Sequence, residues 1–180
     1  MRYTHEASVT LTPTVKWKKP DKKVWNSMKR RLSQGRSLSV DIGWFRGNMH
    51  VGKNGLVLPT AQIAKWNEEG HMTGGMYGMH YVPPRPFIRV GFYQSIISDR
   101  STRDLFITLT RDVAEGRISW QRAYNILGAR LLIRMQKAIK MDIYVPNKPL
   151  TIALKGHGVT LIDTGQMVNS VEYKISRSRG

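Results

Sequence analysis

The sequence predicts an α+β fold preceded by an extended basic N-terminal arm, and three patterns support this prediction. Residues 37–45 alternate apolar and polar side chains, and residues 171–175 alternate again near the end of the chain, as half-buried strands do. Between them, residues 119–141 carry apolar side chains at helical spacing. Basic residues crowd into the start of the chain. We therefore expect a basic N-terminal arm or segment at 1–36 and a single α+β domain at 37–180.

The charge and composition of the chain indicate what kind of partner it meets. With 29 basic and 12 acidic residues among 180, the net charge of +17 favours nucleic acid, an acidic protein surface or anionic lipid. The absence of cysteine excludes disulfides, thiolate metal sites and a cysteine nucleophile. No apolar run approaches the roughly 18 residues of a membrane helix, and residues 1–6 lack the apolar stretch of a signal peptide. We expect a soluble protein made in the cytoplasm, with no membrane partner.

The N-terminal arm has the densest charge. Between residues 16 and 36, nine basic residues accompany one acid, Asp21, which gives this segment a net charge of +8. Pro20 is expected to open a short helix that Gly35 ends, and residues 8–12 alternate as a short strand would. Clustered cations of this kind would hold phosphates without reading bases. The candidate contacts to DNA or to an acidic partner in this segment are Lys16, Lys18, Lys19, Lys22, Lys23, Lys29, Arg30 and Arg31.

The sequence of residues 37–80 predicts two strands, a short helix and a loop. The strand at 37–45 is expected to return through a glycine-rich turn to a second strand at 56–58. Thr60 is expected to cap a short helix that Gly70 ends, with an inner face of Ile63, Ala64, Trp66 and Asn67. Residues 71–80 are rich in Gly, Met and His and predict a mobile loop.

Three helices are expected in the middle of the chain, at about 87–97, 102–114 and 119–141. Ser119 is a good cap for the last of these, and one apolar stripe runs its whole length: Trp120, Tyr124, Leu127, Leu131, Met135 and Ala138. The same helix has a basic stripe that is either a solvated face or a further contact to DNA or an acidic partner: Arg130, Arg134 and Lys137. Shorter helical turns are expected at 151–155 and 167–170.

Asp163-Thr164-Gly165 is a segment with a catalytic pattern. After Leu161-Ile162 it matches the apolar-apolar-Asp-Thr-Gly signature of aspartic proteases, in which two such aspartates share a proton. Only 15 residues follow Gly165 and there is no second copy of the triplet, so a protease would lack the rest of its fold. We interpret the segment as a turn, in which Asp and Thr accept backbone hydrogen bonds and Gly takes a positive φ.

The other candidates for chemistry have less support. Glu69, His71 and His80 are the nearest approach to a metal-ligand set, but they lie in or beside the expected loop. Residues 155–158 (KGHG) lack the spacing of a phosphate-binding P-loop, and no serine lies in a GxSxG turn. We therefore expect no enzyme activity, no metal and no cofactor.

Four segments, taken in order, carry a resemblance to a known family. They are 63–70 (IAKWNEEG), 82–89 (VPPRPFIR), 147–156 (NKPLTIALKG) and 161–171 (LIDTGQMVNSV). The chain resembles the tail-completion, neck and minor-tail proteins of long-tailed bacteriophages, including the virion-morphogenesis proteins of Mu-like phages. It departs from them in its lysine-rich N-terminal segment and in the length of the loop between the first two segments.

The resemblance implies a small antiparallel sheet packed against two or three helices, in a structural virion protein without catalysis. It implies a homo-oligomeric ring at the head–tail junction, often a hexamer, which is assembled in the host cytoplasm and lets DNA pass through its lumen. Its neighbours would be the head-closure or connector protein and the tail terminator or tail tube. The residues expected to fix its turns are Pro83, Pro84, Arg85, Pro86, Phe87, Asp163, Thr164 and Gly165.

A second class of function stays open, namely a standalone basic nucleic-acid-binding protein such as a regulator or a packaging accessory. The net charge and the basic segment 16–36 favour it. Against it, the sequence has no helix-turn-helix, zinc or RRM signature.

Overall fold

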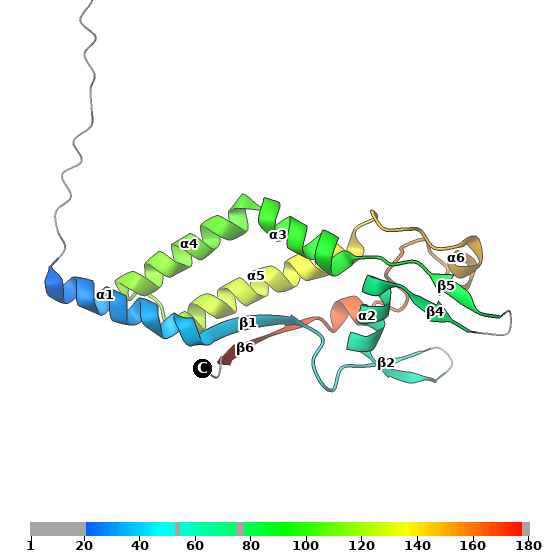
Figure 1. Ribbon diagram of the computed structural model, residues 1–180, viewed down its shortest axis with the longest axis horizontal. Coiled ribbons are helices and arrows are strands. Elements are labelled where there is room, and N and C mark those ends of the chain that lie inside the picture. Colours follow the sequence, from blue (N-terminus) through cyan, green and yellow to red (C-terminus); the bar gives the residue numbers. More distant parts are fainter. Residues whose placement is uncertain (1–20, 53–54, 75–77, 178–180) are drawn as a thin grey trace, which may run out of the picture.

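The predicted α+β class is confirmed by a computed structural model, which describes residues 21–52, 55–74 and 78–177 (Figure 1). Helices lie side by side over one part of the molecule, and two hairpins with three short helices form the other end. The elements in chain order are α1 (Lys22–Gln34), η1 (Gly35–Ser37), β1 (Leu38–Gly43), β2 (Met49–Val51), β3 (Val57–Pro59), α2 (Thr60–Glu69), β4 (His71–Thr73), β5 (His80–Val82), η2 (Phe87–Tyr93), α3 (Gln94–Ser98), α4 (Arg100–Glu115), α5 (Trp120–Lys140), α6 (Pro149–Lys155), α7 (Gln166–Asn169) and β6 (Glu172–Arg177).

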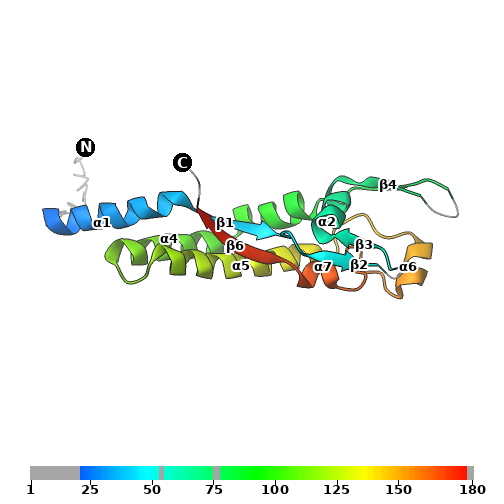
Figure 2. The ribbon, with the colours of Figure 1, turned by 90° about the horizontal axis from the view of Figure 1, so that it is seen from below.

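The two strands predicted near the ends of the domain pair with each other. β1 and β6 are antiparallel, with Leu38 opposite Arg177 and Gly43 opposite Glu172. Both strands contact α5, and Figure 2 shows them running along it. The predicted pairing of 37–45 with 56–58 is therefore wrong: the return strand β3 pairs with β2 instead. The described strands form three separate two-stranded antiparallel sheets, β1–β6, β2–β3 and β4–β5.

The long helix α5 joins the two core clusters of the molecule, as its apolar stripe predicts. Ser119 caps it by accepting a hydrogen bond from the Arg122 amide at 3.3 Å. Its first turns pack on α4 through a small cluster of Leu109, Val113 and Ala123. Its last turns enter the main core, which contains Ala64, Phe87, Phe92, Met135, Ala138, Ile139, Tyr144, Leu161, Met167, Val168 and Val171.

The second half of the predicted N-terminal arm is helical. The Asp21 carboxylate caps α1 by accepting the Lys23 amide at 2.8 Å, and Gly35 ends the helix, as predicted. α1 lies against α4, where Arg31 donates to the Ala114 carbonyl, and Trp120 at the start of α5 donates to the Arg31 carbonyl. Residues 22–34 are thus a docked helix rather than part of an extended arm. The strand predicted at 8–12 lies outside the described residues.

The short helix α2 differs from its prediction in the side chains that it buries. Pro59 takes the N-cap position, so the predicted cap by the Thr60 side chain is wrong, and Thr60 is fully buried instead. Thr60, Ala64 and Glu68, spaced four residues apart, form the buried stripe. Gly70 ends the helix with a φ of 78°, as predicted. The predicted loop at 71–80 is wrong at both of its ends, where β4 and β5 pair as a hairpin.

The predicted helix after the proline-rich turn is confirmed, and a glycine sets its distance from α5. Its first part, η2, is π-helical and continues directly into α3. Gly91 in η2 is buried, and a Cβ there would collide with the Tyr144 hydroxyl and approach the Ala138 Cβ to 2.9 Å. The Tyr144 hydroxyl donates to the Ala138 carbonyl at 2.6 Å. Close contact between η2 and α5 therefore needs a residue without a side chain here.

Gly91→Ala should destabilise the fold by about 1–3 kcal/mol, because the added methyl overpacks the core and displaces the Tyr144 hydroxyl from its acceptor. The measurement is the free energy of unfolding in urea. Gly158→Ala is the matched control, since a Cβ at Gly158 meets no atom within 4 Å and its φ is not positive. Equal stability of the two variants would contradict the described packing.

Candidate functional site

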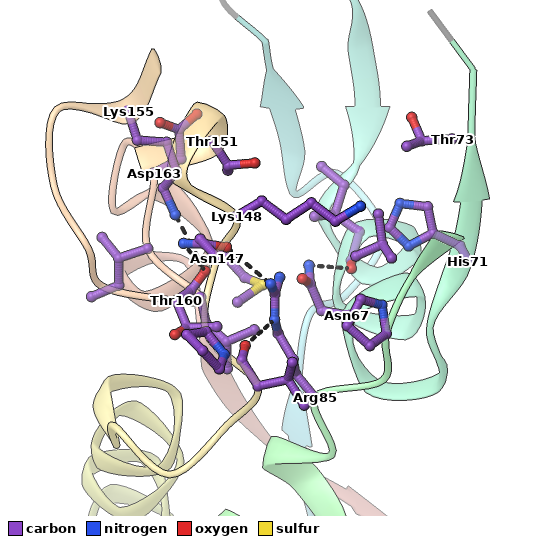
Figure 3. A pocket seen from close by; sticks show the side chains of 18 of the residues that line it. Asn67, His71, Thr73, Arg85, Asn147, Lys148, Thr151, Lys155, Thr160 and Asp163 are labelled. Carbon is purple, nitrogen blue, oxygen red and sulfur yellow. Dashed lines mark hydrogen bonds between the residues drawn. The ribbon is translucent and has the colours of Figure 1, made fainter. Parts of the chain in front are cut away.

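The four segments that carry the family resemblance meet around one cavity of about 590 Å³ (Figure 3). Ile63 and Asn67 of the first segment line the cavity, as do Val82, Pro83 and Arg85 of the second. Its opposite wall comes from α6 with the turn before it, and from the segment that leads into α7. Residues more than 100 positions apart in the sequence thus share one site.

The buried Glu68 carboxylate joins the first of these segments to the second. Glu68 is 8 % exposed, and its two oxygens accept the backbone N–H groups of Ile88 and Arg89 at 2.8 and 3.1 Å. The Arg89 side chain adds a third bond through Nε at 3.1 Å. The first N–H groups of a helix have no partner within the helix, and the positive end of the helix dipole favours an anion. Glu68 therefore caps η2 from a different element of the fold.

Arg85 joins the second segment to the third. It is 7 % exposed, and its Nε and Nη2 atoms donate to the Val145 carbonyl at 3.0 Å and to Asn147 Oδ1 at 2.9 Å. Its own amide donates to the Asn67 carbonyl at 2.7 Å. Burial lowers the pKa of the Arg85 guanidinium from its ordinary value. Arg85 thus ties the proline-rich turn to α2 through its backbone amide and to the approach to α6 through its side chain.

Amide and ammonium donors join the third segment to the two residues directly before the fourth. The Asn147 side chain donates to the carbonyls of Val159 and Thr160 at 3.4 Å each. Lys155 Nζ donates to the same two carbonyls at 2.9 and 3.2 Å. Together with Glu68 and Arg85, these bonds link the first three segments and the residues directly before the fourth into one polar network.

Asp163, Thr164 and Gly165 lie in the turn that leads into α7. Gly165 has a φ of 77°, and Thr164 Oγ1 accepts the Gln166 amide at 3.3 Å. Gln166 then bonds the backbone of β2, where it accepts from Val51 and donates to Met49. In this way the turn positions α7 and the start of β6 beside the β2–β3 hairpin.

The polar lining of the cavity is mainly cationic. Its charged groups are Arg85, Lys148 and Lys155 against the single carboxylate of Asp163. Three histidines, His50, His71 and His80, also line it. Within the described ranges, no three His or acidic side chains are grouped closely enough to hold a metal ion. Glu69, His71 and His80, the nearest approach to a ligand set in the sequence, therefore do not form such a group.

The predicted basic contact residues fall into separate places. Lys16, Lys18 and Lys19 lie outside the described residues. Lys22, Lys23, Lys29 and Arg30 are exposed on α1, and Arg31 docks α1 at the C-terminal end of α4. Arg130 and Arg134 instead face the N-terminal end of α4, while Lys137 is exposed on α5. Among the members that the structure describes, the two basic sets are not brought together.

Arg130 and Arg134 belong to the cap of α4. Arg134 pairs with the Asp99 carboxylate, and Arg130 donates to the Ser101 hydroxyl at 2.6 Å. Hydrogen bonds from Thr102 and Ser101, followed by the charge of Arg134, lower the pKa of Asp99 to about 2. These two arginines are therefore engaged within the fold rather than lining a cationic surface.

Glu68 and Asn147, which connect these segments, were not predicted from the sequence as site residues. A signal for Glu68 is its position, since it continues the four-residue spacing of Thr60 and Ala64 onto the buried face. Asn147 and Arg85 carry no such signal, because each faces a partner in a remote segment.

Comparisons with protein-family models, with curated proteins and with solved structures found no match for this chain. None of the helices in the described ranges combines the length and the apolar character that a membrane crossing needs.

Glu68→Gln should destabilise the protein by about 1–3 kcal/mol, because one carboxylate oxygen becomes an amide donor that faces the N–H groups of η2. Glu69→Gln, the same change at the exposed neighbouring position, should alter stability by less than about 0.5 kcal/mol. Urea denaturation of both variants measures the difference. If Glu68→Gln lowered the free energy of unfolding no more than Glu69→Gln does, the Glu68 cap would contribute little to the stability of η2.

Proposed function

We propose that this chain is a structural virion protein of a tailed bacteriophage, which forms a ring at the head–tail junction and lets DNA pass. The main support is that the four segments of the family resemblance line one cavity, where Glu68, Arg85, Asn147 and Lys155 join the first three of them to the residues directly before the fourth. Segments that shape one scaffold in this way suit a protein whose role is to present surfaces to neighbours.

The exposed apolar side chains support assembly into a larger particle. Large apolar patches on a soluble protein usually mark contacts with other molecules. Here exposed apolar side chains occur on the helices and on both hairpins at the other end. They include Val24, Trp25 and Leu32 on α1, Phe106 and Ile107 on α4, Ile126 and Ile133 on α5, Leu150 and Ile152 on α6, and Met49, Val51, Val57, Met72 and Tyr81 on the hairpins.

The charge of α1 suits either DNA in a lumen or an acidic neighbouring ring. Its exposed cations, Lys22, Lys23, Lys29 and Arg30, are carried on a helix that lies on the outside of α4. Partners in this proposal are further copies of the chain, the head-closure or connector protein and the tail terminator or tail tube.

The second candidate function is a standalone basic nucleic-acid-binding protein. A contact on α1 favours this function. There the half-exposed Trp25 ring lies beside Lys29, and the distance from Lys29 Nζ to the ring centroid is 5.8 Å. An exposed aromatic ring next to cations is suited to stacking on a base.

Negative-stain electron microscopy of the purified protein, alone and mixed with tail tubes, separates the two functions. The ring proposal predicts closed rings or caps at the tube ends, with weak binding to short duplex DNA. A protein that stays monomeric beside the tubes and binds duplex DNA tightly, with a steep loss of affinity as salt rises, would contradict it.

A further inference from the structure

The cavity holds a buried positive charge that no carboxylate of the described residues balances. Arg85 donates only to neutral oxygens, the Val145 carbonyl and the Asn147 side-chain carbonyl, and takes part in no ion pair there. A guanidinium has five N–H donors, of which these bonds use two. A buried cation without a counter-ion is costly, and an anion entering the cavity would relieve that cost.

Further polar groups on the cavity wall have no partner. The side-chain ammonium of Lys148 forms no hydrogen bond or ion pair with any described residue, and the side chain stretches across the cavity toward His71 (Figure 3). Thr160 is 5 % exposed, and its buried hydroxyl has no partner; nor does the buried Nδ1 of His50. Between these groups the wall is apolar, with Ile63 and Leu161 among its residues. The lining is therefore suited to a ligand that alternates anionic or polar groups with apolar ones.

An open strand edge borders the same cavity. β5 belongs to a two-stranded sheet, so the edge facing away from β4 has no strand paired to it. His71, Thr73, His80 and Val82 lie on one face of this hairpin and line the cavity. Tyr81 belongs to the opposite face of the hairpin, and yet it also borders the cavity. The outer edge of β5 therefore lies along the cavity. An extended peptide can add to such an edge and direct alternate side chains into a pocket.

We propose that this cavity binds an extended acidic segment of another protein, which pairs with the outer edge of β5 and places a carboxylate near Arg85 and Lys148. The chain's own basic segments are poor occupants, because residues 16–19 include three lysines and residues 176–180 include two arginines. The proposed binding depends only on the residues around the cavity, so it does not depend on whether the chain forms a ring.

The test uses a short fluorescein-labelled peptide in which Glu and Val alternate, titrated with the full-length protein and followed by fluorescence polarisation. Binding should weaken about tenfold or more when Gln replaces every Glu. Two N-methylated versions of the peptide test the strand edge. In each version, every second backbone amide is methylated, and the two versions differ in which set carries the methyl groups. One version should lose binding and the other should keep it, because only every second N–H of an added strand faces β5.

Lys148→Glu should weaken the Glu–Val peptide about tenfold or more, because it reverses an unpartnered charge on the cavity wall. The matched control is Lys137→Glu, the same change at an exposed position of α5 that does not line the cavity. Circular dichroism shows whether both variants keep the wild-type fold, and Lys148→Ala replaces Lys148→Glu if the latter unfolds.

Equal affinity for the Glu and Gln peptides, or equal loss in the two lysine variants, would overturn the proposal. The proposal would also be overturned if laurate or duplex DNA displaced the bound peptide and N-methylation of the peptide had no effect. That result would indicate a lipid or nucleic-acid site instead. Rings seen by electron microscopy without peptide binding would leave the ring function standing and remove this site.

Discussion

The fold depends on a carboxylate buried at the start of a helix that belongs to another part of the chain. Glu68 accepts the Ile88 and Arg89 amides and so fixes where the helix after the proline-rich turn begins. That helix places Phe87 and Phe92 in the main core, against the last turns of α5. Beside it, burial and then the charge of Glu68 raise the pKa of Tyr144 to about 12, so its hydroxyl stays protonated and can donate to α5.

From this constraint the geometry of the site follows. Once the turn 83–86 is fixed at both ends, Arg85 must point inward, where it orders the approach to α6 through Asn147. Asn147 and Lys155 in turn hold the chain before Leu161, which enters the core. The cavity is the space left between two hairpins and α6 when these bonds are made, and its cationic lining results from the residues that make them.

Much of the fold was predictable from the sequence, because local patterns determine it. The stripe of α5, the cap at Ser119 and the stop at Gly70 depend on residues a few positions apart. The partner of β1 was not predictable, since β6 lies over 120 residues away and a nearer apolar strand at 56–58 followed a glycine-rich turn. The four segments around the cavity were recognised in the sequence as separate stretches and not as one site. Their convergence depends on single contacts such as Arg85 with Asn147, which neither composition nor spacing encodes.

Hydrogen exchange of the Ile88 and Arg89 amides, followed by NMR, tests the central claim about Glu68 most directly. If the buried carboxylate holds the start of η2, both amides should exchange only through global unfolding, as slowly as the Ile139 amide within α5. Amides in the first turn of an uncapped helix exchange through local fraying. Fast exchange at Ile88 and Arg89 beside a protected Ile139 would contradict the account, because η2 would then open independently of the core.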